Sequence, residues 1–383
     1  MIFEMHIIQN FAPSNLNRDD SNTPKDCDFG GCRRARISSQ CIKRSVRRHP
    51  VFIEAVKKAG GNIGIRTKRI KKRLEEMFTR TYNKSPDESA KVAVAVIELL
   101  GLKLSDTEKT EYLLYLGENE VAEIANIAVA DWEALQKKES GKGKKEKGAV
   151  PANMKKIQAN LSEVVAKSRK EAKSYAADIA LFGRMIADNK NMSVDATCQV
   201  AHAISTHKVD MEMDYFTAVD DLLSEEDSGS DMIGTVEFNS SCFYRYSLID
   251  IEKLKGNLGF NDDLLEAVIL AYLDSSVKAI PTGKQNSMAA QNPPGYLRVV
   301  MRNNSFPCSM ANAFQKPIDA SRDKSIEELS IEALNDYYDR LGKIYGKDSI
   351  TCDTCFNIYD PQSLSFDEVL KKVSETLSQG VRS

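Results

Sequence analysis

The segment that most constrains this chain is residues 29–49, FGGCRRARISSQCIKRSVRRH, in which a glycine turn precedes a dense run of cations without an acidic residue. Gly30-Gly31 supplies the turn, and Ser38 or Ser39 is a suitable N-cap for a helix that ends near His49. Positive charges this close together repel one another unless a negatively charged partner neutralises them. The cations are Arg33, Arg34, Arg36, Lys43, Arg44, Arg47 and Arg48.

A helix over this segment has two different faces. At about 100° per residue, Ile42, Val46 and His49 fall on the packing side. The outward side carries Gln40, Lys43, Arg44 and Arg47. Free N–H groups at the helix start favour a phosphate beside Ser38 and Gln40. The alternative is a solvated charged face, but charge that is one-sided, glycine-preceded and without an acidic residue in its own segment favours a polyanion site.

Length and composition indicate a soluble globular protein. A chain of 383 residues with 42% hydrophobic composition can bury a substantial core, as two domains or as one domain with large insertions. No stretch has the roughly 20 apolar residues of a membrane helix, and the polar start does not resemble a signal peptide. We therefore expect a cytoplasmic protein without a membrane partner.

The net charge of −2 hides a strong segregation of charge. Residues 18–85 carry 19 Lys and Arg against 7 Asp and Glu, a difference of +12. Residues 206–275 carry 4 against 16, a difference of −12. The basic region suits nucleic acid, and the acidic region could meet the basic surface of a second copy stacked head to tail.

Cysteine and histidine spacing predicts neither a disulfide framework nor a metal site. The 8 cysteines are sparse and irregular, which is typical of reduced thiols. Cys352-Asp-Thr-Cys355 is a CxxC without a second pair, and the 4 histidines show no zinc-binding spacing. We expect no metal and no cofactor.

The first half of the chain predicts a strand followed by helices. Residues 2–11 predict a buried strand and residues 12–31 a long loop. A helical block runs from about 51 to 137, and its apolar stripes, with Trp132, are typical of a core. Lysine and glycine fill residues 137–148, either as a phosphate-gripping loop or as a solvated linker. A further helix follows to about residue 177.

The second half changes to strands and turns. Residues 197–207 and 235–251 alternate as two paired strands, and the acidic excursion between them is too long for a tight hairpin. Its Tyr215-Phe216 pair could form a small satellite core or an exposed aromatic arm. The later elements are a helix capped by Asn261, a strand near 297–301, and helices around 325–343 and 365–378. This mixture predicts an α+β fold.

Several motifs resemble the backbone subunit of the type I-E CRISPR effector Cascade, the CasC family. The resemblance covers most of residues 1–50 and 178–315 and leaves the helical block and the last seventy or so residues without a recognisable pattern. Cys27, Cys32, Cys41 and the CxxC depart from the family, and the aromatic RNA-binding signature of an RRM sheet is absent. The matching motifs are LNRDD (16–20), FGG-RR-RISSQ-KR (29–44), DIALFGRM (178–185), VAHAISTHKVD (200–210), DYFTAVDDL (214–222), FYRY (243–246) and SMANAF (309–314).

The resemblance implies a modified RRM-like, ferredoxin-like palm with inserted helical fingers and a β-hairpin thumb. Residues 1–58 are then the first part of the palm, 59–178 the fingers with the Lys-rich loop 137–148, and 179–383 the second part, including a thumb at 208–239. Such subunits form a helical filament along a CRISPR RNA (crRNA) and support recognition of target DNA together with other Cascade subunits.

The resemblance and the charge pattern assign residues to two nucleic acids. Cations hold phosphates without reading sequence, Ser and Gln can bond phosphate or a 2′-hydroxyl, and Met185 and the thumb aromatics can contact any base. The expected crRNA contacts are Arg18, Lys25, Arg33, Arg34, Arg36, Ser38, Gln40, Lys43, Arg44, Arg47, Arg184, Met185, Tyr215 and Phe216. The expected DNA contacts are Lys137, Lys138, Lys142, Lys144, Lys145 and Lys147.

Two other functions stay open at this point. A metal-dependent RNA-cleaving subunit would use clustered carboxylates of the loop, Asp19, Asp20, Asp26 and Asp28, although their simpler role is to tether nearby arginines. A monomeric RNA-binding regulator is the second alternative. The type I-E resemblance implies no catalytic residue, because cleavage belongs to a separately recruited nuclease.

Overall fold

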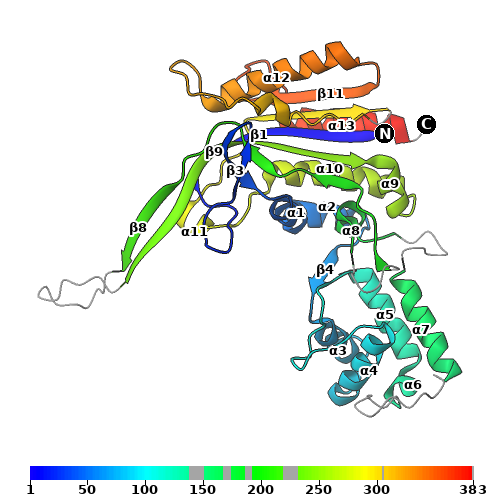
Figure 1. Cartoon of the computed structure of the whole chain (residues 1–383). Coiled ribbons are helices and arrows are strands. Elements are labelled where there is room, and N and C mark those ends of the chain that lie inside the picture. Colours follow the sequence, from blue (N-terminus) through cyan, green and yellow to red (C-terminus); the bar gives the residue numbers. More distant parts are fainter. Residues whose placement is uncertain (138–150, 167–173, 186–191, 219–231, 304–305, 382–383) are drawn as a thin grey trace, which may run out of the picture. The chain divides into compact units, whose positions relative to one another are not determined.

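The computed structural model describes residues 1–137, 151–166, 174–185, 192–218, 232–303 and 306–381 (Figure 1). The chain forms two compact units. Unit 1 consists of Met1–Ala55, Cys198–Glu252 and Glu266–Ser383, and unit 2 of Val56–Thr197 and Lys253–Leu265. The sequence-based division assigned residues 179–197 and 253–265 to the palm, whereas here they belong to the helical unit.

An antiparallel sheet forms the frame of unit 1, and the first strand of the chain lies inside it. β1 (Ile2–Ser14) is paired with β10 (Tyr296–Arg302) on one side and with β9 (Met232–Asp250) on the other. The order across the sheet is β11, β10, β1, β9, β7, β3 and β2, while β6 and β8 also pair with β9. The other strands are β2 (Asp26–Phe29), β3 (Cys32–Ile37), β6 (Cys198–Val200), β7 (Ala203–Ser205), β8 (Glu212–Ala218) and β11 (Ile350–Asn357).

Helices cover both faces of this sheet. Figure 1 shows α12 on one side and α10 with α1 on the other. Ile8 and Tyr244 face α12 and join a core that includes Leu334. On the opposite face Arg245 donates to the Ser276 carbonyl of α10 at 2.8 Å. The helices that lie in or enter unit 1 are α1 (Ser39–Arg48), α2 (Pro50–Lys58), α9 (Ile251–Asn257), α10 (Asp262–Lys278), α11 (Gln285–Met288), η2 (Ala311–Phe314), α12 (Ile326–Tyr345) and α13 (Phe366–Val381).

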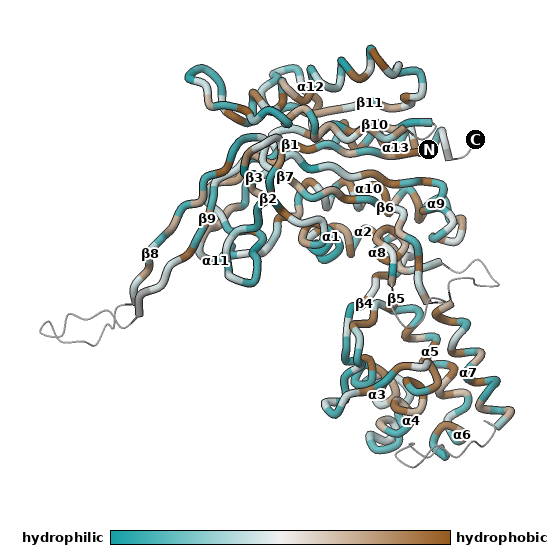
Figure 2. The backbone as a smooth tube through the Cα atoms, viewed as in Figure 1, coloured by the Kyte–Doolittle hydropathy of each residue, from teal (hydrophilic) through white to brown (hydrophobic). Residues whose placement is uncertain are grey.

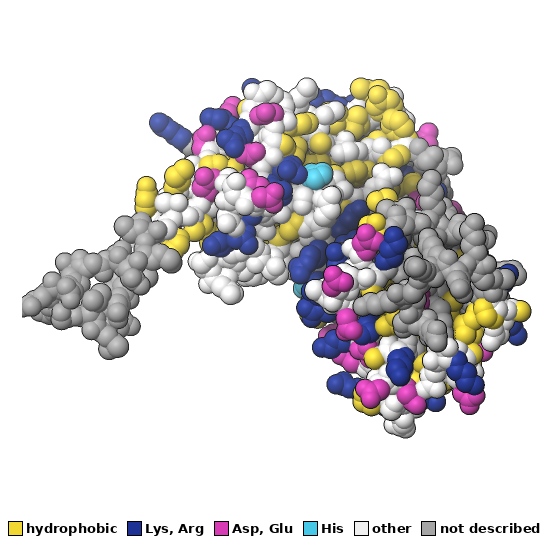
Figure 3. All heavy atoms as spheres, turned by 60° about the horizontal axis from the view of Figure 1, so that its bottom comes forward, with side chains coloured by type: hydrophobic (Ala, Val, Ile, Leu, Met, Phe, Trp, Pro, Cys, Tyr) yellow, Lys and Arg dark blue, Asp and Glu magenta, His cyan; other side chains and the backbone are white. Residues whose placement is uncertain are grey.

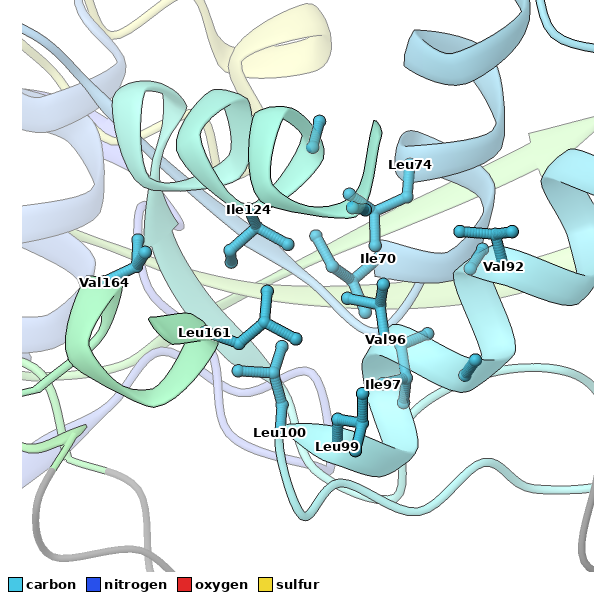
Figure 4. Packing of buried hydrophobic residues seen from close by; sticks show 14 of the residues in the cluster. Ile70, Leu74, Val92, Val96, Ile97, Leu99, Leu100, Ile124, Leu161 and Val164 are labelled. Atoms are coloured by element: carbon cyan, nitrogen blue, oxygen red, sulfur yellow. The ribbon is translucent and has the colours of Figure 1, made fainter. Parts of the chain in front are cut away.

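Unit 2 is a helical bundle with a two-stranded ribbon. Leu74, Val96, Ile124 and Leu161 meet in its core (Figure 4), and brown and teal residues alternate along its helices, as expected of amphipathic segments (Figure 2). Trp132 is only 7% exposed, which confirms that it belongs to the core. The elements are β4 (Gly64–Thr67), α3 (Ile70–Arg80), α4 (Pro86–Leu99), β5 (Leu114–Gly117), α5 (Glu118–Ala130), α6 (Trp132–Gln136), α7 (Ala152–Val164) and α8 (Ala177–Phe182).

Most of the expected elements are present, but several strands and short helices were not expected. The buried first strand, the helical block and the pairing of residues 198–205 with β9 are confirmed. Asn261 caps its helix, with its Oδ1 accepting from the Leu264 N–H at 2.9 Å. The strands β2, β3, β4, β5 and β11 and the helices α8, α9 and α11 were not expected, and the helix predicted to reach about residue 177 ends at Val164 in α7. In the described ranges, no helix is both long and apolar enough to cross a bilayer.

Candidate nucleic-acid interface

The cationic segment begins with a tight turn that only glycine fits. Gly30 and Gly31 have φ angles of +64° and +78° and link β2 to β3. A Cβ atom on Gly30 would lie 1.7 Å from the carbonyl oxygen of Gln315. The positive φ and this close backbone approach both exclude a side chain. The hairpin turn is therefore held against the segment that follows η2.

Arg34 lies inside unit 1 and not at its surface. The side chain is 0% exposed. Its guanidinium donates to the carbonyl oxygens of Phe29 at 3.2 Å, Ser205 at 3.1 Å and Phe314 at 2.8 Å. The prediction that Arg34 touches RNA is wrong for this conformation, because its donors are directed at backbone carbonyls. Arg34 instead joins the hairpin turn to β7 and η2.

The neighbouring arginines lie nearer the surface and are held by the same hairpin. Arg33 is exposed and forms an ion pair with Asp26. Arg36 donates from Nε to the Asp26 carbonyl and from Nη1 to His202 Nδ1, both at 3.0 Å. A guanidinium can only donate, so Nδ1 of His202 accepts this hydrogen bond. Burial, followed by the charges of Arg36 and Lys25, lowers the pKa of His202. Asp26 thus tethers arginines, as the simpler interpretation of the loop carboxylates expected.

The expected helix is present as α1 and has the expected two faces. Ser38 is its N-cap, with Oγ accepting from the Cys41 N–H at 3.3 Å. Ile42 and Val46 are buried, which confirms the packing face. The outward residues are Gln40 and Arg44, which are exposed, and Lys43 and Arg47, which are half-buried. The first turn of α1 contains no acidic residue.

The loop before β2 is tied to the start of α1. Asn17 accepts from the Ser38 N–H through Oδ1 at 2.8 Å, and its carbonyl accepts from the Lys25 N–H at 2.9 Å. Asn17 was not among the predicted site residues, because it lies 21 residues before Ser38 and only the fold brings the two together. Arg18 is exposed, and its Nη1 donates to Asn22 Oδ1 at 3.2 Å. Arg18 and Lys25 are therefore held close to Ser38 and the start of α1.

The two predicted contacts in unit 2 differ completely in exposure. Met185 is 87% exposed, so its thioether is available to a ligand. Arg184 is 3% exposed and pairs with Glu120, with 2.6 Å between Nη1 and Oε2. Its guanidinium also donates to the Met192 carbonyl at 2.7 Å. The prediction of an RNA contact is wrong for Arg184, which stabilises the interior of unit 2.

The β8–β9 ribbon projects from the sheet of unit 1 (Figure 1). Successive residues of a strand point to opposite faces, so Tyr215 and Phe216 lie on opposite faces of this ribbon. Phe216 is opposite Gly234, and its ring lies so close that a Cβ on Gly234 would be 2.2 Å from it. Tyr215 is 72% exposed and shares its face with Met213, which is 64% exposed. Tyr215 and Met213 thus form one exposed apolar face of β8. Met213 was not among the predicted site residues, although an i, i+2 spacing indicates a shared strand face.

The lysine-rich loop is largely outside the described residues. Lys137 is exposed and caps the C-terminus of α6. Lys138, Lys142, Lys144, Lys145 and Lys147 lie outside the described ranges. Figure 3 shows Lys and Arg side chains interspersed with Asp and Glu on the face in view. The DNA contacts expected from this loop stay a prediction.

Two of the loop carboxylates, Asp19 and Asp26, have local partners. Asp19 Oδ1 accepts from the N–H groups of Ser21 at 2.9 Å and Thr23 at 3.0 Å. Such bonds are those of a turn-forming aspartate. Among the described residues, no group of three or more His, Cys, Asp or Glu side chains is placed to hold a metal ion.

Comparison with known proteins identifies the family of this chain. The family model described as CT1975-like protein matches residues 3–381. The chain belongs to the CT1975-like protein family. This CT1975-like chain matches a solved chain of a "CRISPR RNA-guided surveillance complex, pre-nicking" with 28% identity and a TM-score of 0.81, covering 98% of this chain and 100% of that one.

A second solved chain shares the fold of the CT1975-like chain. It comes from a "CRISPR RNA-guided surveillance complex" and has 23% identity and a TM-score of 0.71. The match covers 99% of this chain and 100% of that one. No curated protein matches the chain.

Proposed function

We propose that the CT1975-like chain is a crRNA-binding backbone subunit of a type I-E CRISPR surveillance complex. Unit 1 is the palm, since β1, α1, β7, β9, α10 and β10 follow one another as in a ferredoxin-like βαββαβ unit. Unit 2 corresponds to the fingers and the β8–β9 ribbon to the thumb. The similarity to chains of RNA-guided surveillance complexes supports this assignment.

One observation carries the proposal: a glycine turn, a buried arginine and an N-cap hold an outward row of cations on α1. Gln40, Lys43, Arg44 and Arg47 reach outward while Ile42 anchors the helix. Their chemistry suits ribose-phosphate of any sequence, as a subunit that must accept every guide requires. Target recognition is then delegated to base pairing by the guide.

The same function implies partners beyond the guide. Copies of the chain would assemble in a helical filament along the crRNA and bind target DNA with other Cascade subunits. The opposite charges of residues 18–85 and 206–275 support contacts between copies. We propose no catalytic role for this chain, because Asp19 organises its own turn and Asp26 pairs with Arg33.

Co-expression with a guide tests the proposal. The purified chain should retain RNA with repeat-derived ends and form a multimer of defined mass that protects a fixed RNA length. A monomer of constant mass would support the regulator instead. Cuts in bound RNA at regular spacing with Mg²⁺ would support the nuclease.

A paired substitution tests the observation that carries the proposal. Lys43→Gln with Arg47→Gln removes two charges, so the slope of log affinity against log salt for single-stranded RNA should fall by about 1.4. Arg340→Gln with Lys371→Gln removes the same charge from exposed positions on α12 and α13 and should leave the slope unchanged. Equal slopes for both pairs would contradict the assignment of α1.

A further inference from the structure

A second concentration of cations lies in unit 2, and the family motifs do not include it. Residues 66–73, RTKRIKKR, contain six cations and no acidic residue. Lys71 is 6% exposed, and its Nζ pairs with Glu75 at 3.2 Å and with Glu108. The other five cations are exposed and are here called the α3 strip: Arg66, Lys68, Arg69, Lys72 and Arg73.

The local fold places three cations of the α3 strip on one face of a helix. Arg69 is followed by Lys72 and Arg73 at spacings of three and four residues, which share one face of a helix. Ile70 and Leu74 point the other way into the core of unit 2. At the end of β4, the Arg66 guanidinium carbon lies 4.9 Å from the ring centroid of Tyr115. The strip therefore continues from a strand onto the first turns of α3.

Few acidic side chains of unit 2 form ion pairs with the α3 strip. Arg73 pairs with Glu76 at 3.9 Å, near the limit of an ion pair. Lys68 donates from Nζ to the Glu111 carbonyl at 3.1 Å, which leaves its positive charge unneutralised. Over the described ranges, Arg66, Arg69 and Lys72 form no ion pair with an acidic side chain.

The placement of these cations works against the stability of α3. Like charges three or four residues apart destabilise a helix by about 0.2–0.5 kcal/mol per pair, and cations near its N-terminus oppose the helix dipole. Other helices follow the favourable rule, with Asp87 and Glu88 in the first turn of α4 and Glu327 and Glu328 in that of α12. The first turn of α3 has no acidic residue, a feature that it shares with α1, α2 and α7.

We propose that the α3 strip binds the phosphates of double-stranded DNA. The inference rests on the proposed function, in which the guide occupies cations of unit 1 and the target is the second polyanion. Lys and Arg without base-reading side chains hold a backbone independently of sequence. Tyr115 beneath Arg66 is 5% exposed and offers no face on which an unpaired base could stack, which favours a duplex over a single strand.

Neutralising the strip in the full-length chain tests the site. The variant Arg69→Gln, Lys72→Gln, Arg73→Gln retains residues of good helix propensity. We expect its affinity for a short DNA duplex, measured by fluorescence anisotropy, to fall at least about tenfold at low salt. The slope of log affinity against log salt should decrease by about 2.7, which corresponds to three lost phosphate contacts. Circular dichroism should remain unchanged.

A matched variant separates a site from a general charge effect. Lys91→Gln, Lys155→Gln, Lys156→Gln removes the same charge from exposed positions on α4 and α7 and should change duplex affinity less than threefold. An equal loss in both variants, or none in the strip variant, would overturn the proposal. So would a strip variant that loses single-stranded DNA or RNA but keeps the duplex. If the strip variant is misfolded, Lys72→Gln alone must lower the slope by about 0.9.

Guide retention distinguishes the two proposals. The strip variant should keep the guide RNA that the wild-type chain retains, because α1 and the hairpin are unchanged. A wild-type chain without guide RNA would contradict the proposed function, while its duplex affinity would still report on the strip. Loss of the guide from the strip variant alone would make the strip part of the guide site and overturn its assignment to DNA.

Discussion

Arg34 shows how a residue can matter to a nucleic-acid site without touching the ligand. Replacing it with Gln leaves buried carbonyls of Phe29, Ser205 and Phe314 without their donors. Each unsatisfied buried group costs about 1–3 kcal/mol, so the free energy of unfolding should fall by about 3 kcal/mol or more. Urea denaturation of the variant and the wild type measures this loss in the free energy of unfolding. Arg33→Gln is the control, since its exposed ion pair is worth about 1 kcal/mol or less.

His6 gives the fold a dependence on pH. Burial, followed by the charges of Arg298 and Arg302, lowers its pKa to about 3. The folded value is below that of the unfolded chain, so stability is lost as pH falls below about 6.5, by about 1.4 kcal/mol per unit until the folded pKa is reached. Compared with His6→Asn, the wild type should lose about 2 kcal/mol more between pH 7 and pH 5. If urea titrations show that the wild type and His6→Asn lose the same free energy of unfolding between these pH values, the role of His6 is contradicted.

At the scale of the element, the β8–β9 ribbon separates two aromatic residues that the sequence presents as a pair. Tyr215 stands free beside Met213, whereas Phe216 lies across Gly234. Tyr215→Ala should weaken RNA binding by about 1–3 kcal/mol, the range of an aromatic–base stack. Phe216→Ala should have a smaller effect on affinity, because its ring already covers backbone. Gel-shift titrations that rank the variants in the opposite order would contradict the assignment of the faces.

Sequence patterns predicted the elements better than they predicted side-chain directions. Periodicity located α1 and its buried Ile42 and Val46, because an amphipathic helix repeats at a known period. Arg34 and Arg184 are indistinguishable from surface arginines by type, and the groups that hold them in the interior, carbonyls and for Arg184 also the Glu120 carboxylate, come from distant segments. The strand that holds Cys352 was missed for a similar reason, since its pairing with β10 is a long-range contact.

At the scale of the whole molecule, the sheet of unit 1 is assembled from distant parts of the chain. β1 lies at the N-terminus, but its partners β9 and β10 begin at residues 232 and 296. A fragment of residues 1–197 therefore contains β1 without either partner. It should sediment as aggregate, and Met5→Asp with Ile7→Asp should restore its solubility by removing buried apolar residues of that strand. Solubility that is unchanged by the substitutions would contradict this.

The position of β1 has a consequence during translation. At about 5–20 residues per second, a ribosome takes on the order of 10–50 seconds to extend the chain from β1 to β9. Throughout that interval a strand that is almost entirely buried in the finished sheet waits with its backbone groups unpaired. The nascent protein should then depend on chaperones until its later half emerges. The first strand to be synthesised therefore stays without its partner strands until β9 and β10 have been made.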